Sequence, residues 1–120
     1  IHKNSVFKVL YSDTTNKIYS AGRDAHLIMW ENESEFLEIA AHNYAINDII
    51  ELKDHRLILT CSMDRSIKIW DAENLKLLKV IDKARYPGHG NSINKIMWMP
   101  ENEILLSASD DRSISIWKIF

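Results

Sequence analysis

Residues 60–70 read Thr-Cys-Ser-Met-Asp-Arg-Ser-Ile-Lys-Ile-Trp, and similar stretches occur at 20–30 (Ser-Ala-Gly-Arg-Asp-Ala-His-Leu-Ile-Met-Trp) and 107–117 (Ser-Ala-Ser-Asp-Asp-Arg-Ser-Ile-Ser-Ile-Trp). Each stretch begins with a small hydroxyl residue, places an Asp four residues later and ends with a Trp six residues after that Asp. A His precedes each of these Asp residues by 22 positions. Because chance does not produce such a spacing three times, the chain is predicted to consist of repeated units.

The composition of the 120 residues is typical of a folded soluble domain, with 46% hydrophobic residues, 27% charged residues and a net charge of −2. No cluster of Lys and Arg stands out, which argues against binding to nucleic acid or to a membrane surface. The single cysteine, Cys61, excludes an internal disulfide and fits a reducing compartment. No signal peptide and no apolar run of about 18 residues is found, so we expect a cytoplasmic protein. Since the chain starts at Ile1, we expect it to be a piece of a longer protein.

Short runs rich in β-branched and aromatic residues recur through the chain and predict an all-β fold. The predicted strands are 6–11, 17–21, 27–30 and 36–40 in the first unit, 46–52, 56–62, 66–71 and 75–81 in the second, and 93–99, 103–109 and 113–119 in the third. Polar turns are predicted at 53–55 and 100–102. Residues 33–41 alone would also fit a short helix, but the matching stretch 75–81 favours a strand, and repeated units should fold alike.

The first strand of each unit departs from a simple alternating pattern. Its apolar residues lie three positions apart: Val6 and Val9, Ile46 and Ile49, Ile93 and Ile96. A regular strand repeats every two residues, so the spacing predicts a β-bulge, which re-aims side chains. The Trp residues that end the three stretches, Trp30, Trp70 and Trp117, are 40 and 47 positions apart, and we place the seven extra residues at 82–90, around the turn-forming 86–88.

These features resemble the WD40 repeat family. Trp70-Asp71 is the dipeptide that names the family, and Gly88-His89 is its Gly-His pair. The other copies depart from these dipeptides and read Ala41-His42, Ile1-His2, Trp30-Glu31 and Trp117-Lys118. The resemblance implies three four-stranded antiparallel blades of a β-propeller, the third lacking its outer strand. The repeats are then 1–40, 41–87 and 88–120, as one segment of a longer propeller.

The resemblance also implies one hydrogen-bonded tetrad in each blade. By position these tetrads are His2, Ser20, Asp24 and Trp30; His42, Thr60, Asp64 and Trp70; and His89, Ser107, Asp111 and Trp117. Asp would accept a bond from the His ring, and the hydroxyl would lie between the His and the Trp indole. Such buried polar groups need partners, which gives the tetrad a structural role.

Ser, His and Asp together are also the residue types of a hydrolase triad. Three equivalent copies, each with a Trp, favour a structural network over a single active site, and Gly-x-Ser-x-Gly is absent from the sequence. The sequence contains no His-x-x-x-His or Cys-x-x-Cys pair and no Gly-rich phosphate loop. We therefore predict no catalytic residue, no metal site and no cofactor.

The partner surface is predicted on the face of the ring that carries the His and Asp loops, here called the tetrad face. In the family, partners often contact positions three and five after the His and one before the Asp. These positions are Ser5, Phe7 and Arg23; Ala45, Asn47 and Met63; and Ser92, Asn94 and Asp110. Phe7 and Met63 are apolar where exposure is expected, and an aromatic residue beside an Arg is typical of binding hot spots. Arg85 and Tyr86 in the longer loop are a second candidate.

The resemblance and these residues predict a non-catalytic scaffold that binds other proteins or peptides. Two alternatives stay open. The propeller could organise a catalytic or signalling domain outside this segment, or the segment could close a ring by self-association. In either case we expect the remaining blades to come from the same chain or from other copies.

Overall fold

The computed structural model describes residues 2–82 and 91–120. These residues form three antiparallel sheets. The first contains β1 (Val6–Ser12), β2 (Lys17–Gly22), β3 (His26–Trp30) and β4 (Phe36–Ala40). The second contains β5 (Ile46–Leu52), β6 (Leu57–Ser62), β7 (Ile67–Asp71) and β8 (Leu77–Ile81), with the short helix η1 (Lys53–His55) between β5 and β6. The third contains β9 (Ile93–Met99), β10 (Ile104–Ser109) and β11 (Ile114–Trp117).

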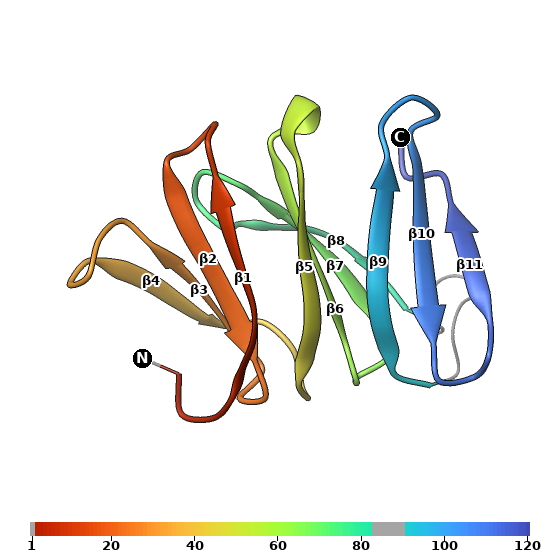
Figure 1. Ribbon diagram of the computed structural model, residues 1–120, viewed down its shortest axis with the longest axis horizontal. Coiled ribbons are helices and arrows are strands. Elements are labelled where there is room, and N and C mark those ends of the chain that lie inside the picture. The colour runs from red at the N-terminus through yellow and green to blue at the C-terminus, as the bar shows by residue number, and fades with distance from the viewer. Residues whose placement is uncertain (1, 83–90) are drawn as a thin grey trace.

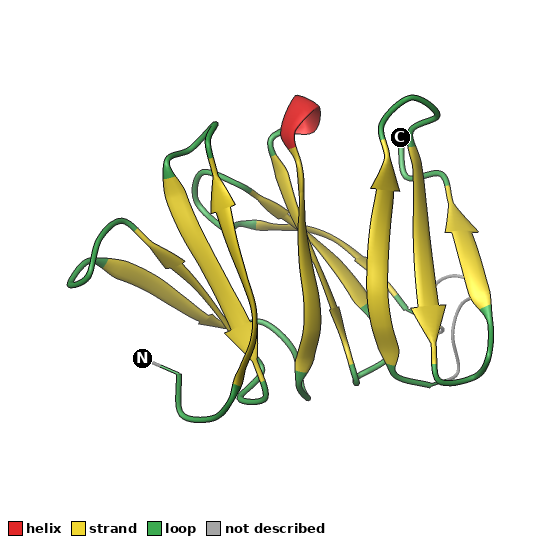
Figure 2. Ribbon diagram, viewed as in Figure 1, coloured by secondary structure: helices red, strands yellow, loops and turns green. Residues whose placement is uncertain are grey.

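The three sheets stand side by side in chain order (Figure 1), and consecutive strands pair within each sheet. The first strands of neighbouring sheets pack together, since β5 contacts both β1 and β9. The tetrad face is the lower end in Figure 1, where β2, β6 and β10 end. The opposite face carries η1, drawn in red in Figure 2, and the turn between β9 and β10. The predicted all-β fold with a three-stranded last sheet is confirmed for the described residues.

Left-handed turn residues set where several strands begin. The second strand of each sheet follows a residue with positive φ: Asn16 at 58°, Arg56 at 55° and Glu103 at 52°. Leu75, with φ of 56°, delays β8 to Leu77 in the same way. The predicted starts at residues 56, 75 and 103 were therefore too early, because this backbone conformation cannot continue a strand. The strand at 36–40 is confirmed as β4, so the helical alternative is excluded.

Each first strand contains the predicted bulge. The pairing register shifts by one residue at Phe7 in β1, at Asn47 in β5 and at Asn94 in β9. The extra residue turns its side chain out of the regular alternation. In the first sheet, Gly22 lies so close to the backbone of Ser5 that any side chain there would collide with the Ser5 carbonyl.

The hydrophobic core lies in the two seams between sheets. The first seam buries Tyr19, Ala21, Leu27 and Met29 of the first sheet against Ile46, Ile49, Ile58 and Trp70 of the second. The second seam buries Leu59, Cys61, Ile67 and Ile69 of the second sheet against Ile93, Ile96 and Leu105 of the third. Each large aliphatic side chain buried in this way contributes about 1.5–3 kcal/mol. Both faces of the middle sheet are covered.

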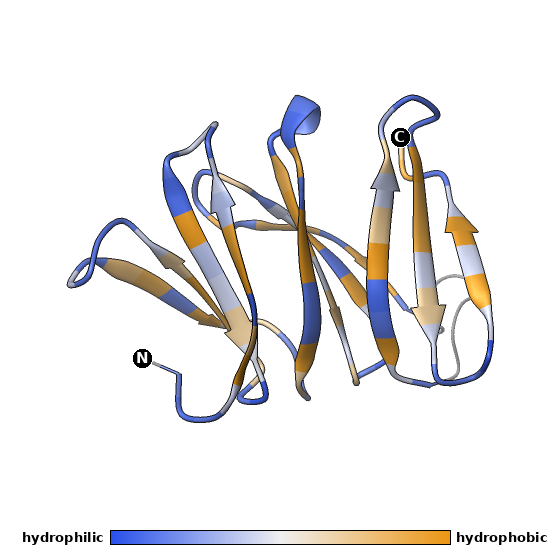
Figure 3. Cartoon of the chain, in the orientation of Figure 1, coloured by the Kyte–Doolittle hydropathy of each residue, from blue (hydrophilic) through white to orange (hydrophobic). Residues whose placement is uncertain are grey.

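On the outer faces of the two end sheets, apolar residues are exposed at positions whose equivalents are buried in the seams. Val9 is 61% exposed, although its equivalents Ile49 and Ile96 are buried in the seams. Ile114 and Ile116 on β11 are 74% and 68% exposed, whereas the equivalent Ile67 and Ile69 are buried. Figure 3 shows hydrophobic residues along β1 and β11 as well as along β5 between them. Both end faces therefore have the chemistry of an unfilled seam.

We expect the isolated 120-residue chain to self-associate through these faces, because exposed apolar surface of this kind favours contact over hydration. Light scattering after size exclusion should give a mass above the 14.0 kDa of one chain, rising with concentration. Replacing Ile114 and Ile116 by Ser should lower that mass, whereas Leu78→Ser on the outer strand β8 should not. A single-chain mass at every concentration would contradict this expectation.

Candidate functional site

The tetrad of the second sheet forms a continuous hydrogen-bonded chain. Nε1 of Trp70 donates to Oγ1 of Thr60 at 2.9 Å, and this oxygen lies 2.8 Å from Nε2 of His42. Since the hydroxyl oxygen already accepts the indole N–H, its own hydrogen points to Nε2. Nδ1 of His42 then donates to the Asp64 carboxylate at 2.8 Å. Thr60 is fully buried, so the chain satisfies polar groups that water does not reach.

The first sheet repeats this arrangement with a Ser in place of the Thr. Oγ of Ser20 lies 2.7 Å from Nε2 of His2 and accepts from Trp30 Nε1 at 2.9 Å. Nδ1 of His2 lies 3.0 Å from Asp24. The four predicted tetrad residues of this sheet therefore lie within hydrogen-bonding distance of one another in a chain.

In the third sheet, Trp117 Nε1 donates to Oγ of Ser107 at 2.9 Å. Asp111 accepts two hydrogen bonds from Ser113, one from its backbone N–H at 2.9 Å and one from its hydroxyl. His89, Arg85 and Tyr86 lie outside the described residues.

Burial and hydrogen bonding shift the titration of the middle tetrad. Burial lowers the pKa of His42 and outweighs the opposing effect of Asp64. Burial acts to raise the pKa of Asp64, but bonds from His42, from the Ser66 hydroxyl and from the Asn43 backbone N–H prevail and hold that pKa well below its usual range. The pair is thus a neutral imidazole donating to a carboxylate near neutral pH.

Backbone bonds fix the candidate partner-binding residues in pairs on the tetrad face. The N–H of Arg23 donates to the Ser5 carbonyl at 2.9 Å. Met63 makes the same bond to Ala45 at 3.0 Å, and Asp110 makes it to Ser92 at 3.2 Å. Each turn before a tetrad Asp is therefore tied to the segment that precedes the first strand of its sheet.

The first seam opens into a hollow of about 380 Å³ at this face. Phe7, Arg23, Tyr44 and Met63 line it, and the Arg23 guanidinium lies 5.9 Å from the centre of the Phe7 ring. Phe7, Tyr44 and Met63 are 44%, 63% and 53% exposed. Ala45 also lines the hollow but is buried, so its side chain offers little surface, in contrast to the exposure expected from the sequence.

The second seam is closed at the same face by polar side chains. Nδ2 of Asn47 donates to Oγ of Ser92 at 3.1 Å and to the Ile93 carbonyl at 2.9 Å. Nδ2 of Asn94 donates to Asp110 at 2.6 Å. These four candidates therefore satisfy one another across or within the sheets, whereas the residues at the first seam face solvent.

The sequence did not predict two residues that matter at this face: Tyr44, which lines the hollow, and Asp48, which bonds between sheets. Tyr44 lies two residues after the tetrad His, and an aromatic residue in that loop was the available signal. Asp48 is buried one residue after the bulge, where it accepts from the Ile96 backbone N–H at 3.2 Å and pairs with Lys8 at 3.1 Å. An acidic residue inside an apolar strand carries no pattern that predicts this bond between sheets.

The described residues offer no arrangement typical of catalysis or metal binding. The tetrad hydroxyls accept the indole N–H and are buried, which removes them as nucleophiles. Cys61 is fully buried, and burial raises the pKa of its thiol, so a reactive thiolate is disfavoured. Within 2–82 and 91–120, no three His, Cys, Asp or Glu side chains gather in a way that could hold a metal ion. That same part of the chain has no helix long and apolar enough to cross a membrane.

The chain is similar to known proteins both in sequence and in structure. The family model described as "WD domain, G-beta repeat" matches residues 34–71 and 81–118, more than half of the chain. A solved structure titled as the WD40 beta propeller domain of Doa1 superposes with a TM-score of 0.83 at 25% identity, covering 99% of this chain and 38% of that one. WD40 propellers are generally non-catalytic and bind other proteins.

Two curated proteins show how far the similarity extends. The chain is 36% identical over 63 residues to WD repeat-containing protein 55 homolog of Drosophila melanogaster, covering 51% of this chain and 13% of that protein. It is 29% identical over 86 residues to Peptidyl-prolyl cis-trans isomerase 9 of Schizosaccharomyces pombe, covering 68% of this chain and 14% of that protein. The chain therefore spans about one seventh of the length of these relatives.

Replacing Asp64 by Ala should lower the free energy of unfolding by about 3 kcal/mol, because the His42 ring, the backbone N–H groups of Asn43 and Ser66 and the Ser66 hydroxyl lose a charged acceptor. Chemical denaturation followed by tryptophan fluorescence measures the change. Asp110→Ala, an exposed aspartate in the corresponding turn of the third sheet, should stay within about 0.5 kcal/mol of the original chain. Equal stability of the Asp64 variant would rule out a supporting role for the tetrad.

Acid should destabilise the fold in two stages. A His whose pKa is lowered by folding binds its proton more readily in the unfolded chain, so protonation of His42 favours unfolding below about pH 6.5. The lowered pKa of Asp64 adds a second loss below about pH 4. Denaturation curves between pH 7 and pH 3 should show this decline. Stability that rises from pH 7 to pH 5 would contradict this expectation.

Proposed function

Because the chain belongs to the WD domain, G-beta repeat family, we propose that it is a non-catalytic scaffold that binds a partner protein in the hollow at the first seam of the tetrad face. The observation that carries this proposal is the grouping of Phe7, Arg23, Tyr44 and Met63 around one depression. Aromatic residues, Met and Arg are enriched at the centres of protein interfaces. Singly exposed apolar residues are ordinary, but three around a concave site favour a contact with an apolar partner group.

The rigidity of the hollow supports the proposal. The Phe7 side chain is directed by a bulge, and the Arg23 and Met63 backbones are each held by a bond to the preceding loop. A preformed site loses little conformational entropy on binding, so more of the contact energy appears as affinity. The exposed Arg23, stacked on Phe7 and without an ion pair among the described residues, would add a contact to a carboxylate or carbonyl of the partner.

A second candidate is a propeller that accompanies an enzyme domain. It is favoured by the similarity to a protein named as a peptidyl-prolyl isomerase. In this case the sheets would position the enzyme or its substrate and would perform no chemistry themselves. The two candidates differ in what occupies the first-seam hollow: a separate protein in the first, and a domain of the same chain in the second.

Substituting Phe7, Arg23 and Met63 by Ala together should weaken partner binding at least tenfold, because hot-spot residues carry most of the affinity. A photo-crosslinking amino acid placed at Tyr44 of the complete protein would first identify the partner by mass spectrometry. Affinity of that partner for the triple variant would then be measured by calorimetry, with circular dichroism to verify the fold.

The matched control replaces Leu77 and Leu78, apolar residues of similar exposure on the outer strand β8. This control should bind the partner as the original protein does. Undiminished affinity of the triple variant would remove the tetrad-face hollow from consideration. A crosslink to another segment of the same polypeptide would favour the enzyme-associated candidate.

A further inference from the structure

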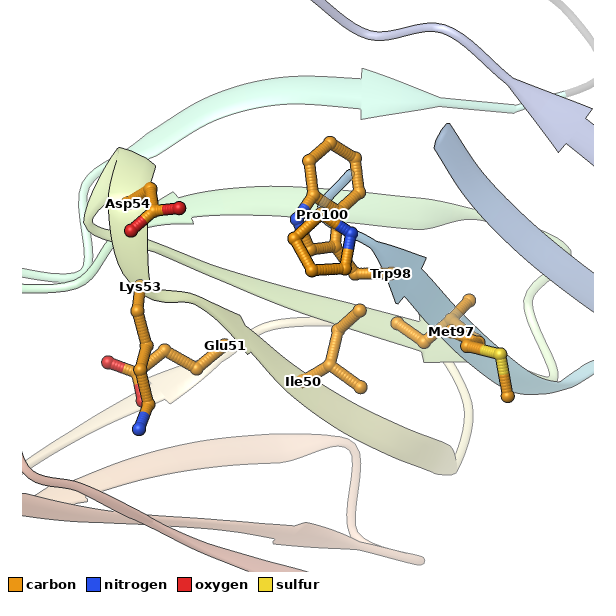
Figure 4. A pocket seen from close by; sticks show the side chains of 8 residues that line it. Ile50, Glu51, Lys53, Asp54, Met97, Trp98 and Pro100 are labelled. Atoms are coloured by element: carbon orange, nitrogen blue, oxygen red, sulfur yellow. The ribbon is translucent and has the colours of Figure 1, made fainter. Parts of the chain in front are cut away.

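A second hollow, of about 490 Å³, lies at the other end of the other seam, between the second and third sheets near the opposite face. Ile50 and Asp54 bound it from the second sheet, and Met97, Trp98 and Pro100 bound it from the third (Figure 4). Its lining residues belong to β5, η1, β9 and the turn after β9, so it lies between two described sheets and not on an open end face. It also lies apart from the tetrad-face hollow and shares no residue with it.

Glu51 and Trp98, which occupy equivalent positions in the two sheets, both line this hollow but make different contacts. Glu51 and Trp98 each lie two residues after the apolar residue that pairs with the tetrad hydroxyl. At the first seam, Glu51 reaches back to the preceding sheet and accepts bonds from Ser12 at 2.5 Å and Thr14 at 2.9 Å. At the second seam the indole of Trp98 cannot make such bonds and packs against aromatic rings instead.

Those aromatic rings and the core of the second seam hold the half-buried indole in place. His55 and Phe120 stack on each other with their centres 3.9 Å apart and their planes 6° from parallel. Trp98 stands perpendicular to both, at 5.9 and 5.8 Å between centres. Because the two stacked rings are adjacent, they lie on the same side of the indole. Trp98 is therefore held rigidly while also lining the hollow.

The charges around the hollow favour a cation. Lys53, the cation among the lining residues, is engaged by Asp13 at 3.2 Å. Asp54 lines the hollow and makes no hydrogen bond or ion pair with any described residue. The turn at 100–103, which follows β9, has two Glu and no Lys or Arg, and Arg56 in the turn that carries Asp54 is paired with Glu73.

We propose that this hollow binds an arginine side chain presented by a peptide segment of a partner protein. The guanidinium stacks on Trp98 where the indole lines the hollow and pairs with the Asp54 carboxylate, while Ile50, Met97 and Pro100 contact the aliphatic part of the segment. Arginine fits better than lysine because its planar group both stacks on an indole and donates two parallel bonds to a carboxylate. The surrounding negative charge raises the encounter rate of such a segment.

The test uses the complete protein and the peptide acetyl-Ala-Leu-Arg-Leu-Ala-amide, with otherwise identical peptides that carry Lys or Glu at the centre. The indole N–H signal of Trp98, assigned with a Trp98→Phe variant, reports binding in nuclear magnetic resonance titrations. The Arg peptide should shift this signal in a saturable way, and Asp54→Asn should raise its Kd about tenfold. Asp110→Asn, which removes an exposed carboxylate on the tetrad face, should leave the Kd unchanged.

Three results would overturn the proposal. The first is binding of the Glu peptide as tight as that of the Arg peptide, which would show that the hollow does not select a cation. The second is an unchanged Kd in Asp54→Asn, which would remove the pairing. The third is equal affinity for the Lys peptide, which would remove the assignment to a planar guanidinium. Because Asp54 is exposed and makes no bond among the described residues, its substitution tests binding without disturbing the fold.

Discussion

The first and second sheets each depend on one buried hydroxyl that a His and a Trp side chain share. Thr60 joins the Trp on the third strand of its sheet to the His that precedes the first strand, and through that His to the turn at Asp64. Two strands, the loop before the first strand and a turn are thus cross-linked by groups that water does not reach, so losing any one leaves the others unpaired. In the described residues every buried side-chain nitrogen and oxygen has a partner. That constraint is met in the same way in the first and second sheets.

The seams between sheets are less constrained than the sheets themselves. A sheet can present any apolar residue of suitable size toward its neighbour, whereas the tetrad admits few substitutions. The bulged position is Phe7 in one sheet and Asn47 in the next, and only the latter bonds across to the following sheet. Likewise Glu51 bonds to the sheet before it, whereas Trp98 does not. The repeated framework thus allows neighbouring seams to differ at both faces.

Much of the fold follows from local spacing alone. Hydroxyl, Asp and Trp at fixed distances define the unit, and apolar residues three apart predicted the bulges at Phe7, Asn47 and Asn94, because both signals lie within one strand or turn. The hollows could not be predicted in this way. The burial of Ala45 and the bond from Asp48 to the next sheet depend on how far apart two sheets stand, which no local pattern encodes.

Both proposed binding sites therefore lie at seams between sheets rather than within single repeats. At the first seam the bulge carries Phe7 instead of an amide, and at the second Trp98 stands in place of a carboxylate. In both cases an aromatic ring stands where a bonding polar group stands at the other seam. The same difference supplies a flat apolar surface that a partner group can cover. Because the tetrads keep the surrounding backbone fixed, one residue can change the lining of a site without reshaping the sheet that carries it.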